Sequence, residues 1–215
     1  MKRIPVLIIG ARADGHAKVV LEILKAGKEY EVVGFIDDAI DKKGISIKGI
    51  KVIGTTDDLQ KLKKAKKAKG AIVAIGDNPA RRNLSQKILK SGLELINAIH
   101  PTVYKDPDVK IGKGCYIGQG VIIVTGTVIG NCVNIHTGAT IDHDNIIEDG
   151  ANLGPGVHTA GRVRIERDAF LGTGAIVIPD AGVGEGTIVG AGAVVINHLP
   201  PHITAVGVPA KAVKR

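Results

Sequence analysis

The sequence contains one histidine that is flanked directly by two carboxylates. His143 lies between Asp142 and Asp144, whereas none of the other six histidines has an acidic neighbour. An imidazole can accept a proton near neutral pH, and a carboxylate beside it can orient the ring and raise its basicity. His143 and Asp144 are therefore candidates for a general base and its partner. The alternative is a histidine in a solvent-exposed turn.

Metal and thiol chemistry have weaker support. The separations of His136, His143 and His158 along the chain match no recognised zinc motif. Cys115 falls on a packing position of the repeat described below, and Cys132 precedes Val133 with no histidine beside it. We therefore expect no metal and no covalent acyl-enzyme. Two cysteines are also too few for a disulfide framework.

A loop near the start of the chain has the composition of a phosphate-binding turn. It runs from Gly10 to His16 and follows an apolar segment. Backbone N–H groups in such a loop, together with the N-terminus of the next helix, bind a pyrophosphate. A plain tight turn is the alternative for these glycines.

The first hundred residues alternate between apolar runs and amphipathic segments. The predicted strands are 4–9, 31–36, 71–75 and 93–99, and the predicted helices are 16–26, 56–65 and 78–91. Strands separated by helices indicate a small parallel sheet of the nucleotide-binding type. We therefore predict a Rossmann-like α/β domain over residues 1–100.

After His100-Pro101 the sequence repeats with a period of six. Of fifteen positions reached in steps of six, fourteen are aliphatic and only Thr159 is not; they are Ile111, Ile117, Ile123, Ile129, Ile135, Ile141, Ile147, Leu153, Thr159, Ile165, Leu171, Val177, Val183, Val189 and Val195. A period of six fits a strand-plus-turn unit with one aliphatic side chain pointing inward. Three units make one triangular coil, so fifteen units predict a parallel β-helix of five coils over residues 101–215.

The composition agrees with such a narrow core and excludes several classes of protein. Only five residues are aromatic, 29 are glycine, and 44% are hydrophobic, which excludes a disordered chain. No apolar run is long enough to span a bilayer, so a cytoplasmic protein without membrane contact is expected. The net charge of +8 comes largely from a lysine-rich stretch at 61–69. No aromatic residues interleave these lysines, so no nucleic-acid partner is expected.

The hexapeptide pattern resembles that of the left-handed β-helix acyltransferases, and the closing segment Gly207-Val208-Pro209-Ala210-Lys211 looks like their terminal signature. Together with the N-terminal domain, the chain is similar over its full length to the NeuD/PglD-like sugar acetyltransferases. The matching segments are Gly15-His16-Ala17-Lys18-Val19-Val20, Phe35-Ile36-Asp37-Asp38, Ala74-Ile75-Gly76-Asp77-Asn78, Ile99-His100-Pro101 and Ile141-Asp142-His143-Asp144.

This resemblance implies roles for particular residues. His143 matches the catalytic histidine of the family, and Asp144 stands where the family commonly has glutamate. The substrate-binding residues that it implies are Asp14, Gly15, His16, Asp37, Asp38 and Gly76. The acetyl-CoA-binding residues that it implies are Asn152, Gly161, Thr173 and Ala191. The loop before His16 is longer by two positions than the usual family pattern.

The resemblance also implies the activity. We expect an acetyl-CoA-dependent N-acetyltransferase acting on a nucleotide-activated 4-amino-4,6-dideoxy sugar, with UDP the expected nucleotide, by direct attack of the amine on the thioester. The family places its sites between neighbouring subunits, so a homotrimer is expected. The alternatives are an O-acetyltransferase of sialic acid or a related sugar, and a non-catalytic trimer that binds sugar nucleotides.

Overall fold

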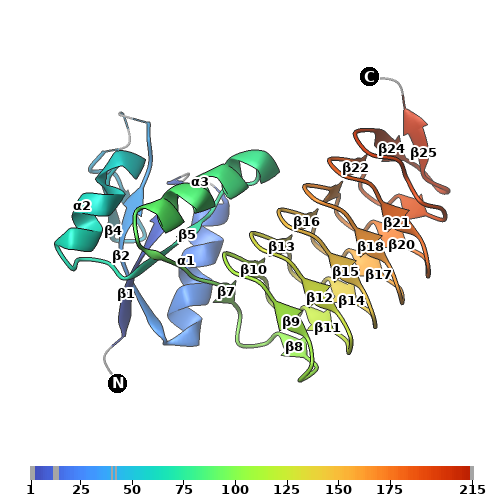
Figure 1. Ribbon diagram of the computed structural model, residues 1–215, viewed down its shortest axis with the longest axis horizontal. Coiled ribbons are helices and arrows are strands. Elements are labelled where there is room, and N and C mark those ends of the chain that lie inside the picture. Colours follow the sequence, from blue (N-terminus) through green and yellow to red (C-terminus); the bar gives the residue numbers. More distant parts are fainter. Residues whose placement is uncertain (1–2, 12–14, 40, 42, 214–215) are drawn as a thin grey trace. The chain divides into compact units, whose positions relative to one another are not determined.

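The computed structural model describes residues 3–11, 15–39, 41 and 43–213, and it divides into two compact units, Met1–Pro101 and Thr102–Arg215 (Figure 1). The first unit contains a sheet with helices, and the second is a stack of short parallel strands. Both architectures agree with the fold predicted from the sequence.

The N-terminal unit is built on a six-stranded sheet in the order β3-β4-β2-β1-β5-β6. Its strands are β1 (Ile4–Ile9), β2 (Tyr30–Ile36), β3 (Ser46–Ile47), β4 (Ile50–Gly54), β5 (Gly70–Val73) and β6 (Glu94–Leu95). Every pairing is parallel except that of β3 with β4. The central strand β1 therefore has β2 on one side and β5 on the other, which is the arrangement that opens a crevice at the carboxyl ends of the strands.

The helices lie where the apolar periodicity predicts them. They are α1 (His16–Gly27), the 3-10 turn η2 (Thr56–Asp58) leading into α2 (Leu59–Lys64), and α3 (Asn78–Lys90). Helix α1 buries Val20, Leu21 and Leu24. Helix α3 begins at an N-cap, since the side chain of Asp77 accepts a hydrogen bond from the N–H of Ala80 at 2.8 Å.

The β3–β4 hairpin is an element of the N-terminal unit that the sequence interpretation missed. Its turn is formed by Lys48 and Gly49, which both have positive φ, at 48° and 84°. A two-residue turn of this kind is usually signalled by Asn-Gly or Asp-Gly, and Lys-Gly is a weaker signal. The predicted strand over 93–99 is also divided, into β6 and the separate β7 (Ala98–Ile99).

The second unit is a β-helix whose strands are nearly all two residues long. The strands are β8 (Tyr104–Lys105), β9 (Lys110–Ile111), β10 (Tyr116–Ile117), β11 (Ile122–Ile123), β12 (Val128–Ile129), β13 (Asn134–Ile135), β14 (Thr140–Ile141), β15 (Ile146–Ile147), β16 (Asn152–Leu153), β17 (His158–Thr159), β18 (Arg164–Ile165), β19 (Phe170–Leu171), β20 (Ile176–Val177), β21 (Gly182–Val183), β22 (Ile188–Val189), β23 (Val194–Val195), β24 (Thr204–Val206) and β25 (Lys211–Val213). The fifteen hexad positions are the second residues of β9 to β23, and all but Ile111 are buried.

Residues that lie one coil apart pair in parallel along three faces, as a triangular coil of three hexads requires. Ile123 pairs with Ile141, for example, and Ile129 pairs with Ile147. The aromatic residues Tyr104, Tyr116 and Phe170 all occupy the first position of their strands rather than the inward hexad position. The left-handed β-helix with an aliphatic core is thus confirmed.

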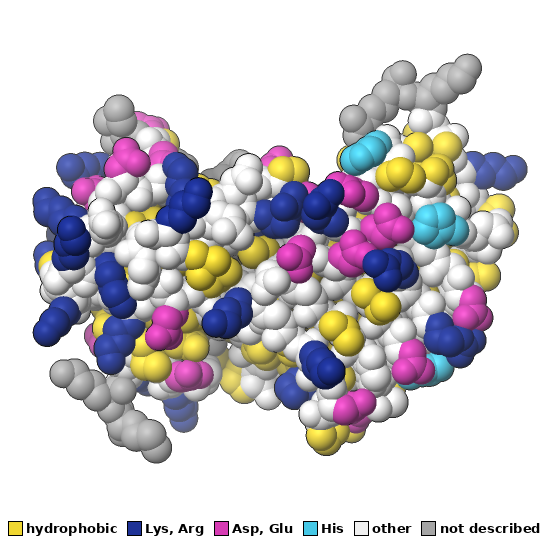
Figure 2. Space-filling model, viewed as in Figure 1, with side chains coloured by type: hydrophobic (Ala, Val, Ile, Leu, Met, Phe, Trp, Pro, Cys, Tyr) yellow, Lys and Arg dark blue, Asp and Glu magenta, His cyan; other side chains and the backbone are white. Residues whose placement is uncertain are grey.

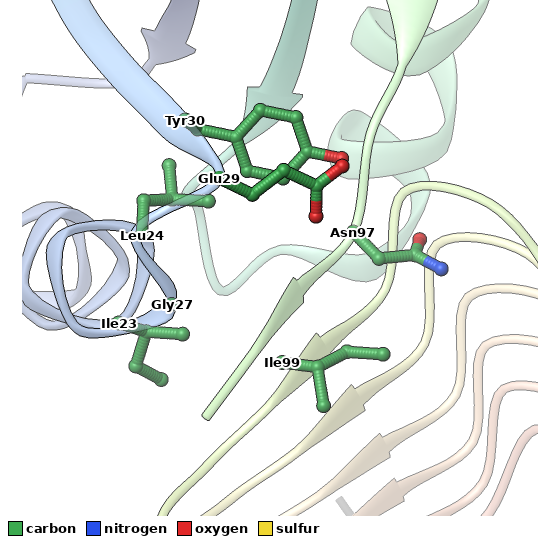
Figure 3. A pocket seen from close by; sticks show the side chains of 7 residues that line it. All are labelled: Ile23, Leu24, Gly27, Glu29, Tyr30, Asn97 and Ile99. Atoms are coloured by element: carbon green, nitrogen blue, oxygen red, sulfur yellow. The ribbon is translucent and has the colours of Figure 1, made fainter. Parts of the chain in front are cut away.

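Alkaline pH is expected to destabilise the protein through its tyrosines. Burial, followed by the neighbouring carboxylate of Glu29, raises the pKa of Tyr30 to about 12. Figure 3 shows these two side chains together in a cavity of about 140 Å³ lined by residues such as Leu24 and Ile99. A hydrogen bond to Asp106 raises the pKa of Tyr104, and burial raises the pKa of Tyr116.

Because a folded-state pKa above the unfolded value favours the neutral phenol in the folded protein, this stabilisation is complete below about pH 10 and is lost as the pH rises towards 12. Titration of the phenolate absorbance should therefore show ionisation displaced above the ordinary tyrosine pKa, together with a falling melting temperature. Three tyrosines that titrate at their ordinary value in the folded protein would contradict the buried setting of Tyr30.

Candidate functional site

His143 lies in the turn between β14 and β15, at one corner of the β-helix. The backbone of this turn is held by the coils on both sides. The N–H of Asp142 donates to the carbonyl of Thr159 at 3.1 Å, and the N–H of Asp144 donates to the carbonyl of Thr125 at 3.0 Å. The N–H of His143 donates to the carboxylate of Asp142 at 2.7 Å. The turn is therefore rigid enough to position a side chain.

The side chains of His143 and Asp144 form a hydrogen-bonded pair. Nδ1 of His143 lies 2.8 Å from Oδ2 of Asp144, and 39% of the His143 side chain is exposed. Asp144 has a φ of 57°, a left-handed conformation that aspartate and asparagine tolerate better than most residues. With Nδ1–H donated to a carboxylate, Nε2 keeps its lone pair and can accept a proton. This arrangement fits the predicted base and its partner.

Glycines on the adjoining coils make room for both side chains. A Cβ at Gly161 would overlap Nε2 and Cε1 of the His143 ring, so the ring lies directly against this glycine. A Cβ at Gly126, where φ is 73°, would overlap the carboxylate of Asp144 in the same way. Gly161 was expected to line the acetyl-CoA site; the structure places it against the imidazole of His143.

An ion pair that the sequence interpretation missed lies on the same corner. Arg162 donates to both carboxylate oxygens of Asp180, at 2.7 and 2.9 Å. These hydrogen bonds are the main reason why the pKa of Asp180 lies below its ordinary value, and the positive charge of Arg162 contributes in the same direction. The same place on three successive coils is occupied by Asp144, Arg162 and Asp180. Counting one coil at a time from Asp144 would therefore have identified the ion pair from the sequence.

The predicted acetyl-CoA residues fall on separate parts of the β-helix. Thr173 and Ala191 are exposed and lie one coil apart, in the turns that follow β19 and β22. Asn152 is buried in β16, on the face that leads to those turns. Gly161 lies on the other corner, with His143. A single chain therefore carries the predicted base and the exposed predicted acetyl-CoA residues on different corners.

The predicted substrate residues of the N-terminal unit gather at the carboxyl edge of its sheet. Gly10 directly follows β1 with a φ of 100°, and a Cβ there would lie 2.8 Å from the side chain of Ile75. Its N–H donates to the carbonyl of Ile36 at 2.8 Å, which joins the ends of β1 and β2. Asp37 accepts from the N–H of Ala11 at 2.7 Å. The loops after β1, β2 and β5 therefore meet at one edge.

The remaining predicted substrate residues have differing surroundings. Asp38 accepts hydrogen bonds from the N–H and the hydroxyl of Thr56 at 2.7 and 3.0 Å, and so also shapes this edge. Gly76 faces open space, and Gly15 is the N-cap of α1 without a side-chain cap, with His16 as the first helical residue. Asp14 lies outside the described residues.

The surface charge is unevenly distributed. On the face shown in Figure 2, Lys and Arg side chains gather over the N-terminal unit, whereas carboxylates and histidines are interspersed over the β-helix. Among the described residues, no group of three or more His, Cys, Asp or Glu side chains is placed to hold a metal ion. Within the same ranges, no helix has the length and apolar character needed to cross a membrane.

Comparison with known proteins gives a consistent result over both units. The family described as PglD N-terminal domain matches residues 5–88. GDP-perosamine N-acetyltransferase from Escherichia coli O157:H7 is 34% identical over 196 residues, covering 89% of this chain and 86% of the relative. The crystal structure of PerB from Caulobacter crescentus, in complex with CoA and GDP-perosamine, is 41% identical with a TM-score of 0.91, covering 98% of this chain and 97% of PerB.

A third relative has the same two-unit fold. The acetyltransferase domain of PglB from Neisseria gonorrhoeae, in complex with acetyl coenzyme A, is 34% identical with a TM-score of 0.89, covering 99% of this chain and all of that domain. The sequence-based family assignment is thereby confirmed. The chain belongs to the NeuD/PglD-like family of left-handed β-helix sugar acetyltransferases with a PglD-type N-terminal domain.

Proposed function

We propose that this protein transfers the acetyl group of acetyl-CoA to the amine of a GDP-linked 4-amino-4,6-dideoxy sugar, with GDP-perosamine as the first candidate. The likeness over most of the chain to the GDP-perosamine N-acetyltransferases of Escherichia coli O157:H7 and Caulobacter crescentus supports this choice. It also favours GDP over the UDP expected from the sequence. Acetyl-CoA and nucleotide sugars are made in the cytoplasm, which is where we place the enzyme.

The observation that carries the proposal is the 2.8 Å contact between Nδ1 of His143 and Oδ2 of Asp144. It leaves Nε2 as the proton acceptor, on a ring that is partly exposed. Two further structures of the Caulobacter enzyme, with histidine-to-asparagine and histidine-to-alanine substitutions, hold CoA and GDP-perosamine. A histidine that can be replaced while both ligands remain bound is compatible with a role in proton transfer.

The proposed reaction is an acetyl transfer in which the lone pair on Nε2 of His143 accepts a proton. The neutral sugar amine attacks the thioester carbonyl, and the C–N bond forms while the carbonyl π electrons move to oxygen. Nε2 of His143 accepts the proton that the amine loses. The tetrahedral intermediate then collapses, the C–S bond breaks, and the proton passes to the departing CoA sulfur. No acyl-enzyme is needed, which agrees with Cys115 and Cys132 being buried.

The N-terminal unit supplies a site for the nucleotide part of the sugar. We propose that the residues following β1 in the sequence, Asp14, Gly15 and His16, contact the nucleotide sugar. We further propose that Asp37, Asp38 and Gly76 line its site at the carboxyl edge of the sheet. The N-terminus of α1, which begins with Gly15 as N-cap and His16 as first helical residue, favours a diphosphate there through its N–H groups and its dipole. A carboxylate can accept several hydrogen bonds at once, which suits Asp37 and Asp38 to a ligand that donates them.

A thiol-release assay tests this proposal. Wild-type protein and acetyl-CoA are incubated in three separate reactions, one with GDP-perosamine, one with the matching UDP-linked amino sugar and one with free sialic acid. We expect CoA release with GDP-perosamine above all. Preference for the UDP sugar would overturn the choice of nucleotide, preference for sialic acid would indicate O-acetylation, and release with none of the three would favour a non-catalytic binding protein.

We also propose that the enzyme is a homotrimer. The predicted base lies on one corner of the β-helix, whereas Thr173 and Ala191 lie on another, so a complete site requires a corner from a second copy. Light scattering should give roughly three times the chain mass of 22.4 kDa. A monomer at micromolar concentration would contradict a site shared between subunits.

A further inference from the structure

The inward corner column beneath His143 is polar on two coils, the coil that carries the turn and the coil before it, and apolar on the coils beyond them. This column takes one residue from each successive coil and comprises Val109, Thr127, Asn145, Val163 and Ala181. Thr127 and Asn145 are fully buried, with no exposed surface. A buried amide is costly unless it is hydrogen-bonded, and valine at the neighbouring positions shows that an apolar residue fits this column.

Among the residues that the structure describes, the amide of Asn145 donates only to backbone carbonyls around the histidine. Its Nδ2 lies 2.8 Å from the carbonyl oxygen of Asp142, 3.1 Å from that of His143 and 2.8 Å from that of Ala160. The first two carbonyls belong to the turn that carries the imidazole. The third precedes Gly161, against which the ring rests. The side chain of Asn145 therefore connects the backbone of the His143 turn with the backbone next to Gly161.

Thr127 completes this arrangement from the coil before. Its hydroxyl donates to the carbonyl of Asp142 at 3.0 Å and lies 3.3 Å from the N–H of Asn145. The carbonyl of His143 is held a second time, by the N–H of Arg162 at 2.9 Å. Oδ1 of Asn145, in contrast, has no hydrogen-bond partner among the described residues. The two N–H bonds of the amide are therefore shared among the three carbonyl oxygens.

We infer that Asn145, supported by Thr127, is a positioning residue for His143. It fixes the imidazole relative to Gly161 and so sets where Nε2 lies against the acceptor amine. The inference rests on the proposed function, because it assigns Asn145 a task in the same proton transfer. It concerns the placement of the base and not the binding of either substrate.

The test compares Asn145→Val with Thr187→Val as a matched control. Valine stands at the equivalent position 163, so the first variant should fold. Thr187 is also fully buried on an inward corner, where its hydroxyl donates to Pro200 at 2.6 Å and lies 3.3 Å from the N–H of Ile203, away from His143. We expect Asn145→Val to lower kcat on the order of 10- to 100-fold with KM for acetyl-CoA unchanged, since a small misplacement of a catalytic group has this effect. Thr187→Val should leave kcat near the wild-type value.

A double-mutant cycle separates positioning from general loss of structure. In a His143→Ala background, Asn145→Val should cause no further loss of kcat, because residues that act as one unit are not additive. An equal loss in both backgrounds, or an equal loss in Thr187→Val, would overturn the inference. Should Asn145→Val not fold, Asn145→Thr takes its place, since threonine already occupies position 127.

A readout that needs no turnover distinguishes this inference from the proposed function. The imidazole Cε1–H resonance of His143, assigned by its absence from His143→Ala, should shift in Asn145→Val and not in Thr187→Val. An unchanged resonance would overturn the positioning role even in an active enzyme. A shifted resonance in a protein that acetylates none of the panel would contradict only the proposed function.

Discussion

His143→Ala is expected to lower kcat by about 10²- to 10⁴-fold, the range for loss of a general base. The KM for acetyl-CoA should change little, because the imidazole acts on the proton of the acceptor amine. The melting temperature should also be retained, since Ile141 and not His143 occupies the inward position of this hexad. Steady-state kinetics measure kcat and KM, and thermal unfolding measures the melting temperature.

The matched control is His198→Ala, which removes another exposed histidine of the β-helix, 4.0 Å from Glu166. It should keep wild-type kcat. Asp144→Asn should cost less than His143→Ala, because asparagine tolerates the left-handed backbone of this position and the base remains. The double variant should lose scarcely more than His143→Ala alone. Near wild-type kcat in His143→Ala would return His143 to the role of a turn residue.

Gly161→Ala should reduce kcat by on the order of 10²-fold although it removes no ionisable group. The added methyl group would occupy the space of Nε2 and Cε1 of His143, so the ring must turn away. The backbone at Gly161 does not require a positive φ, so the effect comes from the displaced imidazole rather than from backbone strain. Kinetics combined with a crystal structure of the variant would show both the loss and the displaced ring.

Gly182→Ala provides the matched control for this steric effect. A Cβ at Gly182 would come within 2.6 Å of the imidazole of His198, an exposed side chain that can move. It should leave kcat near the wild-type value. Equal activity of Gly161→Ala and Gly182→Ala would show that the position of the His143 ring against Gly161 is not needed for turnover.

The β-helix was predictable because its core imposes a strict rule on the sequence. One aliphatic side chain must point inward in every hexad, so Ile111 to Val195 mark the coils without any knowledge of contacts. Thr159 interrupts the rule yet stays buried, and its hydroxyl has no hydrogen-bond partner within the described ranges. The β3–β4 hairpin has no comparable repeat in its sequence. Its turn depends on the positive φ of Lys48 and Gly49, and a lysine at such a position is a weak sequence signal.

The candidate site was predictable only in part, for reasons of geometry. The pair His143 and Asp144 is local and visible in the sequence. Other contacts of the site join residues on successive coils: Gly161 with His143, Arg162 with Asp180, and Asn145 with Ala160. Finding them from the sequence requires the length of one coil, because the partners are not adjacent in the chain. In the N-terminal unit, the hydrogen bonds that Asp37 and Asp38 accept from loop residues likewise depend on how the loops close over the sheet edge.

The most direct test of the central claim is the identity of the acetylated product. Wild-type protein, acetyl-CoA and GDP-perosamine are incubated, and the nucleotide sugar is analysed by mass spectrometry before and after treatment with hydroxylamine, which cleaves esters and spares amides. We expect GDP-perosamine to gain one acetyl group that survives this treatment, and we expect no gain with His143→Ala protein over the same time. An acetyl group that hydroxylamine removes, or an unmodified sugar with wild-type protein, would contradict the assignment as an N-acetyltransferase of this substrate.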